Sequence, residues 1–204
     1  MFRNRHKLLE IIAGPNGSGK SSFASTLFGG NGWQINFINA DIVATGLAPG
    51  REELASFRAG RVVLSSVIDA IEKRESVAFE STLSGKTWEG VIRRARANGF
   101  HVTIYFLFLE NIAMNLKRIE KRVRAGGHSI PPPTVRRRYP RSFFNFWKIY
   151  RAHCDDWFIF DNSSTRPVLV LGKRGWEELS SVEKGSFELS FLARALHNGK
   201  AKTR

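Results

Sequence analysis

Cysteine is nearly absent from this sequence, and long apolar runs are missing. The single cysteine, Cys154, cannot form a disulfide within the chain, and no Cys or His residues cluster near it as they do in metal sites. This usage is typical of a reducing compartment, and we interpret Cys154 as a packing residue. No apolar run approaches the roughly 20 residues of a membrane span, and the N-terminal segment lacks the features of a secretory signal. We therefore expect a cytoplasmic protein that does not enter the membrane.

Acidic residues are also scarce, which leaves the chain strongly basic. The sequence has 32 Lys and Arg against 18 Asp and Glu, a formal net charge of +14. Such a field attracts anions of every kind. Nucleic acid, nucleotides, an acidic partner protein and anionic membranes all qualify, so the charge alone does not choose among them.

The order of the apolar segments indicates the fold class. Short apolar segments rich in aromatic and β-branched residues predict strands at 7–13, 35–40, 77–82, 101–109, 157–161 and 167–172. Helical patterns are predicted at 20–28, 52–73, 86–98, 110–125, 134–153 with a break near Pro140, and 186–197. Alternating helices and doubly apolar strands are typical of a parallel sheet with helices on both faces. We therefore predict a doubly wound α/β fold with a mainly parallel sheet of five to six strands, forming a single domain over residues 1–204.

A glycine-rich turn carries the strongest functional signal. Residues 14–21 read G-P-N-G-S-G-K-S, the phosphate-loop pattern, between a predicted strand and a predicted helix. Glycines let the backbone wrap closely around a phosphate, and the helix N-terminus adds partial positive charge. Lys20 can reach the β- and γ-phosphates of ATP, and the Ser21 hydroxyl can ligate Mg²⁺. A turn without a ligand would need neither the Lys-Ser pair nor three glycines. We therefore predict a P-loop NTPase-type fold that binds nucleotide through Gly14, Pro15, Asn16, Gly17, Ser18, Gly19, Lys20, Ser21 and Ser22.

Three acidic residues come at the carboxyl ends of predicted strands. Asp41, Glu80 and Asp161 should lie at the edge where an open parallel sheet binds its ligands. Glu80 and Thr82 are two residues apart and should face the same side. Each acid alone could instead cap a following helix, but three beside a phosphate loop favour a catalytic or substrate-binding role.

A basic segment at 117–139 predicts a lid over the site. We expect Ile112, Leu116, Ile119 and Val123 to form the buried stripe of a helix, with Arg118 and Arg122 on a neighbouring face. Two glycines, Gly126 and Gly127, should end this helix, and Pro131–Pro133 should begin the next. Arginines beside such a hinge can bind the oxygens of a transferring phosphate. A solvated basic face is the alternative, and we interpret His128 as a loop packing residue. Residues 166–204 are expected to add a C-terminal strand and helix.

Five separated motifs together resemble a known family. AGPNGSGKSSFA, FINAD, VAFESTLSG, RVRAGGHSIPPPTVRRRY and FDNSS, in this order over residues 8–165, resemble the zeta toxin family of P-loop kinases, especially its compact chromosomal members. The resemblance implies ATP-dependent phosphorylation of a hydroxyl of UDP-N-acetylglucosamine, which interferes with the supply of cell-wall precursors. It also implies an acidic antitoxin for some members.

The same resemblance implies roles for individual residues. Lys20 would hold phosphates, and Asp41 would be the general base that activates the sugar hydroxyl. The nucleotide sugar would contact Glu80 and Thr82. Transferred charge would be stabilised by Arg122 together with Arg136 or Arg137. Larger family members carry more helical substrate-binding sequence than this chain has room for.

Two other classes of function stay open at this point. The charge of +14 favours a nucleic-acid-directed P-loop enzyme, such as a polynucleotide kinase or an ATPase. Against it, we find no aromatic-basic recognition motif, and the aromatic residues of SFFNFWKIY fall at helical spacing as in a core. The third class is a nucleotide-bound interaction module without catalysis.

Overall fold

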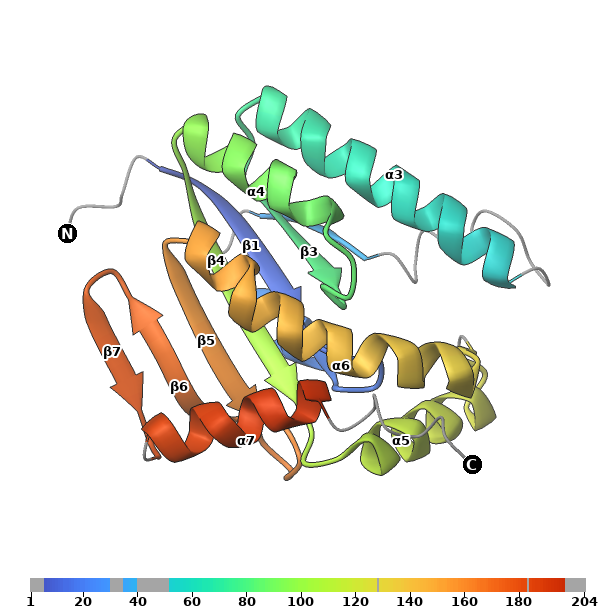
Figure 1. Ribbon diagram of the computed structural model, residues 1–204. Helices are drawn as coiled ribbons and strands as arrows, with labels where there is room; N and C mark the ends of the chain where they lie inside the picture. Colours follow the sequence, from blue (N-terminus) through green and yellow to red (C-terminus); the bar gives the residue numbers. More distant parts are fainter. Residues whose placement is uncertain (1–5, 30–34, 40–51, 128, 183, 197–204) are drawn as a thin grey trace.

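The computed structural model describes residues 6–29, 35–39, 52–127, 129–182 and 184–196 (Figure 1). The strands in these ranges are β1 (Lys7–Ala13), β2 (Asn36–Ile38), β3 (Val77–Ser81), β4 (Phe100–Phe108), β5 (Asp156–Asp161), β6 (Val168–Arg174) and β7 (Glu177–Ser180). The helices are α1 (Lys20–Phe28), α3 (Glu52–Glu72), α4 (Thr87–Ala97), α5 (Ile112–Arg124), α6 (Pro132–Lys148), the 3-10 helix η1 (Tyr150–His153) and α7 (Lys184–Leu196).

The described residues form one seven-stranded sheet in the order β2-β3-β1-β4-β5-β6-β7. The first five strands of this order are parallel, and β6 and β7 are antiparallel. The central strand β1 pairs with both β3 and β4, so Ile11 lies opposite Phe79 on one side and Ile104 on the other. This arrangement confirms the predicted α/β class with a mainly parallel sheet.

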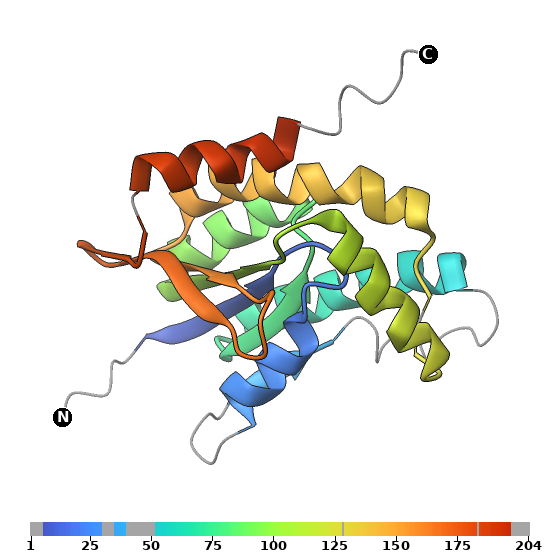
Figure 2. The same cartoon turned by 90° about the horizontal axis from the view of Figure 1, so that it is seen from below.

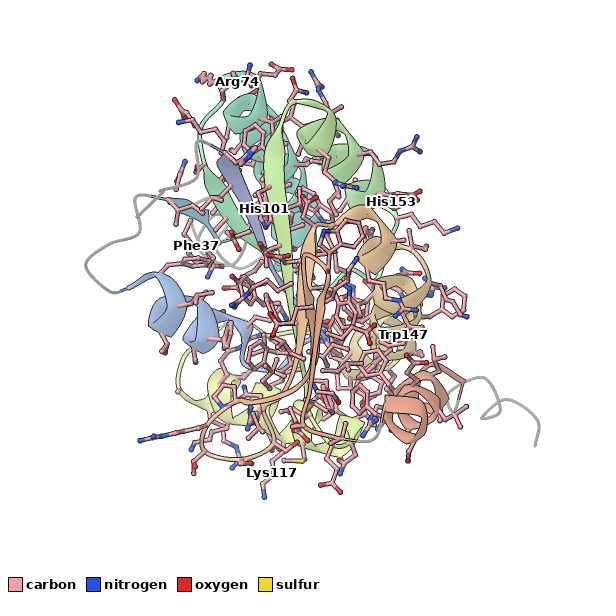
Figure 3. All side chains as sticks on the ribbon, turned by 90° about the vertical axis from the view of Figure 1, so that its left-hand side faces the viewer. Phe37, Arg74, His101, Lys117, Trp147 and His153 are labelled. Carbon is pink, nitrogen blue, oxygen red and sulfur yellow. The ribbon has the colours of Figure 1, made fainter. Side chains whose placement is uncertain are left out.

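Helices cover both faces of the sheet. The main core packs α3, α4, α6 and α7 against one face, and α1 covers the other face through a smaller apolar cluster around Ile12, Ala24 and Leu107. Figure 2 shows the two layers on either side of the sheet. Among the residues labelled in Figure 3, Phe37 lies beside α1 and Trp147 lies on α6. The predicted aromatic core of α6 is confirmed for Phe143, Phe146 and Trp147, which are at most 4% exposed. It is wrong for Phe144, which is 46% exposed.

Two details differ from the sequence prediction. The strand β7 was not predicted, because its sequence EELS has a single apolar residue and a short polar strand at a sheet edge carries almost no periodic signal. The predicted break at Pro140 is wrong, since α6 continues through it. Proline removes one helical hydrogen bond, but Tyr139 and Phe143 on either side of it are buried in the core and hold the helix together.

Cys154 is a packing residue, as predicted. Its side chain is 7% exposed, and burial raises the pKa of the thiol to about 12, so it stays protonated. Among the helices of the described ranges, none combines the length and the apolar character needed to cross a membrane.

One buried carboxyl group lies in the central strand. Glu10 is 2% exposed, and its Oε1 accepts a hydrogen bond of 3.4 Å from the Thr103 hydroxyl on β4. Burial raises the pKa of Glu10 to about 7, although Tyr105 and His101 nearby oppose the shift. The folded protein therefore holds a proton that the unfolded chain releases near pH 4.5.

We expect this group to make the protein less stable as the pH rises. Between about pH 4.5 and pH 7 the folded state binds more protons than the unfolded state, so the free energy of unfolding should fall by about 3 kcal/mol. The variant Glu10→Gln should lose most of this decline, whereas the exposed Glu75→Gln should keep it. Urea titrations of the three proteins at about pH 4 and pH 8 measure the difference. Equal declines in wild type and Glu10→Gln would contradict the assignment.

Candidate active site

The loop between β1 and α1 is built on three glycines. Gly14, Gly17 and Gly19 have φ values of 135°, 77° and 91°, which residues with side chains rarely adopt. Gly19 is the N-cap of α1, which begins at Lys20. Having no side chain, Gly19 cannot cap the first N–H groups of the helix, and a helix start of this kind attracts anions. All nine predicted nucleotide-binding residues lie in this loop or in the first turn of α1.

Neighbouring atoms also leave no space for a side chain at these three glycines. A Cβ on Gly14 would lie 2.0 Å from the carbonyl oxygen of Leu107, at the end of β4. On Gly17 it would lie 2.6 Å from the carbonyl oxygen of Asn115, and on Gly19 it would lie 2.4 Å from Nδ2 of Asn162. The loop is therefore a packed structure pressed between β4, α5 and the end of β5, in addition to being a turn that needs positive φ.

Lys20 points back over this loop. Its Nζ donates to the carbonyl oxygens of Gly14 and Pro15, each at 3.0 Å. The ammonium group is thus held at the mouth of the loop, within reach of the place where phosphates would lie against the N-terminus of α1.

Ser21 meets Glu80 beside the loop. The Ser21 hydroxyl donates to Oε2 of Glu80 at 3.0 Å, and Nδ2 of Asn39 donates to Oε1 of Glu80 at 3.2 Å. A hydroxyl and a carboxylate are the hard oxygen donors that Mg²⁺ prefers, and Mg²⁺ usually takes only one or two protein ligands besides water and phosphate oxygens. This donor pair fits Mg²⁺. Sequence reasoning gave Ser21 this role but placed Glu80 with the substrate alone.

The segment after β3 is held by α6 and η1. Its carbonyl oxygens accept hydrogen bonds from Ser142 at Thr82, from Asn145 at Leu83 (2.9 Å) and from Tyr150 at Gly85 (2.6 Å). The Thr82 hydroxyl lies 2.9 Å from the hydroxyl of Ser84. Leu83 is buried with φ of 50°, a strained value for leucine that persists because the surrounding contacts fix the backbone. Thr82 is therefore presented on a rigid segment beside Glu80.

The inward face of α5 differs from the predicted stripe. Asn115 and Ile119 are the buried residues of this helix, and Arg118 and Arg122 are partly buried. Val123 was predicted to be buried but is 39% exposed, because the face that meets the loop is centred on Asn115 and Ile119. The α5 helix lies along the carboxyl edge of the sheet, next to the loop (Figure 2).

The end of α5 was predicted correctly. Gly126 has φ of 83°, its N–H donates to the carbonyl oxygen of Val123, and the N–H of Gly127 donates to that of Arg122 at 2.9 Å. This is the glycine-based helix end known as a Schellman motif. It fixes the backbone of the last turn of α5, which carries Arg122.

The arginines of α6 divide into exposed and half-buried side chains. Arg136 and Arg137, the two candidates for the second lid arginine, are exposed, and Arg138 is partly buried. Burial, together with the positive charge of Arg137, lowers the pKa of Arg138. Arg138 therefore turns toward the protein, on the side of α6 that carries the buried Val135 and Tyr139.

The predicted acids do not all meet. Asp41, the predicted general base, lies outside the described residues, as does His128. Glu80 is on β3 and Asp161 is on β5, with β1 and β4 between them, so they are about 14 Å apart along the sheet. Both lie at the carboxyl edge of the parallel strands, as expected. Only Glu80 contacts the first turn of α1, whereas Asp161 accepts a hydrogen bond of 2.8 Å from the backbone N–H of Ser163, a local turn contact.

Sequence reasoning missed two residues that contact the loop, Asn115 and Asn162, and gave Arg118 only a place on the face of the lid helix. Asn115 and Asn162 donate to loop carbonyl oxygens, and Arg118 donates to the carbonyl oxygen of Asn162 at 2.8 Å. One signal was present in the sequence: Asn115 is a polar residue within an otherwise apolar helical stripe. Asn162 lies in the FDNSS motif, and nothing else in the sequence indicates that it contacts the loop.

Comparison with known sequences gives one relative of high coverage. No family model matches the chain. An uncharacterized protein of Haemophilus influenzae is 36% identical over 129 residues, which cover 63% of this chain and 90% of that protein.

Solved structures share the fold at low sequence identity. A chain of the AvrRxo1-ORF1:AvrRxo1-ORF2 complex matches with a TM-score of 0.70 and 17% identity, over 98% of this chain and 66% of that chain. This complex has also been solved with ATP. A chain of the PezAT chromosomal toxin-antitoxin system of Streptococcus pneumoniae matches with a TM-score of 0.59 and 15% identity, over 95% of this chain and 88% of that chain. The present chain thus spans about two thirds of the length of the first of these structures.

Proposed function

We propose that this chain, which belongs to the same family as the Haemophilus influenzae protein, is an ATP-dependent kinase that phosphorylates a hydroxyl of a nucleotide sugar such as UDP-N-acetylglucosamine. The observation that carries the kinase assignment is the contact between Ser21 and Glu80 beside the glycine loop and Lys20. Loop, ammonium, hydroxyl and carboxylate are the parts that a polyphosphate with its metal ion requires. The ATP complex of the structural neighbour supports ATP as the donor.

The nucleotide end of the reaction uses the loop. Backbone N–H groups of the loop and of the first turn of α1 hold the β- and γ-phosphates, and Lys20 adds a charge-assisted contact. Ser21 and Glu80 would hold Mg²⁺, which would neutralise charge on the phosphate oxygens when bound.

The acceptor end rests on the resemblance to zeta toxins. Thr82, on its rigid segment, and Glu80 bind the nucleotide sugar. The acceptor oxygen forms a bond to the γ-phosphorus as the bond from that phosphorus to the bridging oxygen of ADP breaks, and the hydroxyl proton passes to Asp41. Charge on the transferring group is stabilised by Arg122 together with Arg136 or Arg137.

We predict that Arg122→Ala lowers turnover by roughly a hundredfold or more with little loss of ATP affinity, because a lid arginine acts mainly on transition-state charge. The matched control is Arg124→Ala, on the same helix, whose side chain is exposed and paired with Glu120 at 2.6 Å. Steady-state kinetics and nucleotide titrations of both variants measure the two effects. Equal losses of turnover and of ATP affinity would make Arg122 a ground-state or structural contact.

An acidic inhibitory protein is the partner that we propose. The formal net charge of +14 favours an acidic surface. Both structural neighbours support such a partner, since one is a two-protein complex and the other belongs to a toxin-antitoxin system.

The same charge supports a second candidate, a nucleic-acid-directed P-loop enzyme. The two are separated by supplying γ-labelled ATP and Mg²⁺ with nucleotide sugars, other small hydroxyl compounds, and 5′-hydroxyl DNA or RNA oligonucleotides. Label in a nucleotide sugar supports our proposal. Label in an oligonucleotide, or ATP hydrolysis that rises with added nucleic acid and falls steeply with salt, would favour the second candidate.

A further inference from the structure

Two asparagine side chains donate hydrogen bonds to the phosphate loop from neighbouring elements. Nδ2 of Asn115, on α5, donates to the carbonyl oxygen of Asn16 at 2.8 Å. Nδ2 of Asn162, just after β5, donates to the carbonyl oxygen of Ser18 at 2.8 Å. Asn115 is fully buried and Asn162 is 9% exposed. The two carboxamides therefore hold alternate peptide groups of the same loop.

The geometry of the peptide bond gives these contacts a consequence. In a trans peptide the carbonyl oxygen and the following N–H point in opposite directions. With the oxygen of Asn16 bound to Asn115, the N–H of Gly17 must point away from α5. With the oxygen of Ser18 bound to Asn162, the N–H of Gly19 must likewise point away from the end of β5. Each carboxamide thus turns one glycine N–H toward the side of the loop opposite its own contact.

Both asparagines are themselves held in place. The backbone N–H of Asn162 donates to the carbonyl oxygen of Phe108 at 2.9 Å, and its carbonyl oxygen accepts from Arg118 at 2.8 Å. Asn115 lies in the first turn of α5, which is capped by the Asn111 side chain. The missing side chains of Gly17 and Gly19 leave the space into which the two residues fit.

We propose that Asn115 and Asn162 are positioning residues that hold the N–H groups of Gly17 and Gly19 in the orientation that binds phosphate, before nucleotide arrives. The inference rests on the proposed function, because it gives the loop a polyphosphate ligand. A loop that is ordered in advance loses little conformational entropy on binding. Without either carboxamide, one loop peptide can turn over and present a carbonyl oxygen to the phosphates.

The test uses Asn115→Leu and Asn162→Leu, which keep approximate shape and neutral charge but remove the donor. The control is Thr103→Val, at a site 3% exposed on β4 whose hydroxyl donates to Oε1 of Glu10, away from the loop. Magnesium tripolyphosphate is the probe, titrated by calorimetry below the unfolding temperature of every variant. Alanine at the same position replaces any leucine variant that does not fold.

We expect each loop variant to bind tripolyphosphate roughly tenfold more weakly, as for one lost hydrogen bond of about 1.4 kcal/mol. Thr103→Val should lower the unfolding temperature but keep wild-type affinity, a difference that a merely structural role of the two asparagines would not produce. If the wild type binds tripolyphosphate and both loop variants bind it with the same affinity, the positioning role is overturned and the proposed function is not. Failure of the wild type to bind tripolyphosphate would overturn the proposed function, and the positioning role with it.

Discussion

Asp41→Asn should lower phosphoryl transfer by roughly a hundred- to ten-thousandfold while ATP affinity and stability stay near the wild-type values. A sugar hydroxyl is a poor nucleophile at neutral pH. A carboxylate within hydrogen-bond reach orients it and accepts its proton as the phosphate transfers, which an amide cannot do. Asparagine keeps the shape of aspartate, so the loss should appear in the chemical step.

The control for this variant is Asp69→Asn, an exposed position on α3. Label transfer from ATP to the acceptor and nucleotide titration are measured for both variants. Joint loss of ATP and Mg²⁺ affinity in Asp41→Asn would make Asp41 a metal ligand, and Glu80 would become the candidate base. Wild-type transfer to every acceptor would reduce Asp41 to a helix cap and contradict the mechanism.

Lys20→Ala should abolish turnover and remove most of the affinity for ATP. The ammonium group is held at the mouth of the loop by two carbonyl oxygens at 3.0 Å. A charge-assisted contact to β- and γ-phosphate oxygens has no substitute among the residues of the loop itself, which are otherwise uncharged.

The control is Lys73→Ala, exposed in the turn after α3. Affinities for ATP and for adenosine separate phosphate binding from base binding. Only the affinity for ATP should fall in Lys20→Ala, and Lys73→Ala should match the wild type in both. Full activity in Lys20→Ala would end the kinase proposal.

The sequence was sufficient to predict the parallel part of the sheet because its central strands β1, β3 and β4 are largely buried on both faces. Val77, Ala78 and Phe79 are all fully buried, and such runs read clearly as internal strands. The polar strand β7 gives no such signal. The break predicted at Pro140 is wrong because packing outweighs local preference. Proline disfavours a continuous helix, but the buried side chains of Tyr139 and Phe143 stabilise one.

The glycine loop was also readable from sequence, since its pattern is contiguous. The residues that support the loop could not be identified from the sequence. Asn115 and Asn162 contact residues that are 99 and 144 positions away in the chain, and a carboxamide that donates to a backbone oxygen requires only a position in space, with no pattern of neighbours. Likewise, Arg136, Arg137 and Arg138 are alike in sequence, and only the rotation of α6 decides which of them is partly buried.

The central claim is that the γ-phosphate of ATP is transferred to a hydroxyl of a nucleotide sugar. The most direct measurement supplies wild-type protein and Lys20→Ala with γ-labelled ATP, Mg²⁺ and UDP-N-acetylglucosamine, and follows the label by mass spectrometry. The account predicts that the wild type produces ADP and a nucleotide sugar with one added phosphate, and that Lys20→Ala produces neither. Label that stays in ATP, or that appears only as free phosphate, would contradict it.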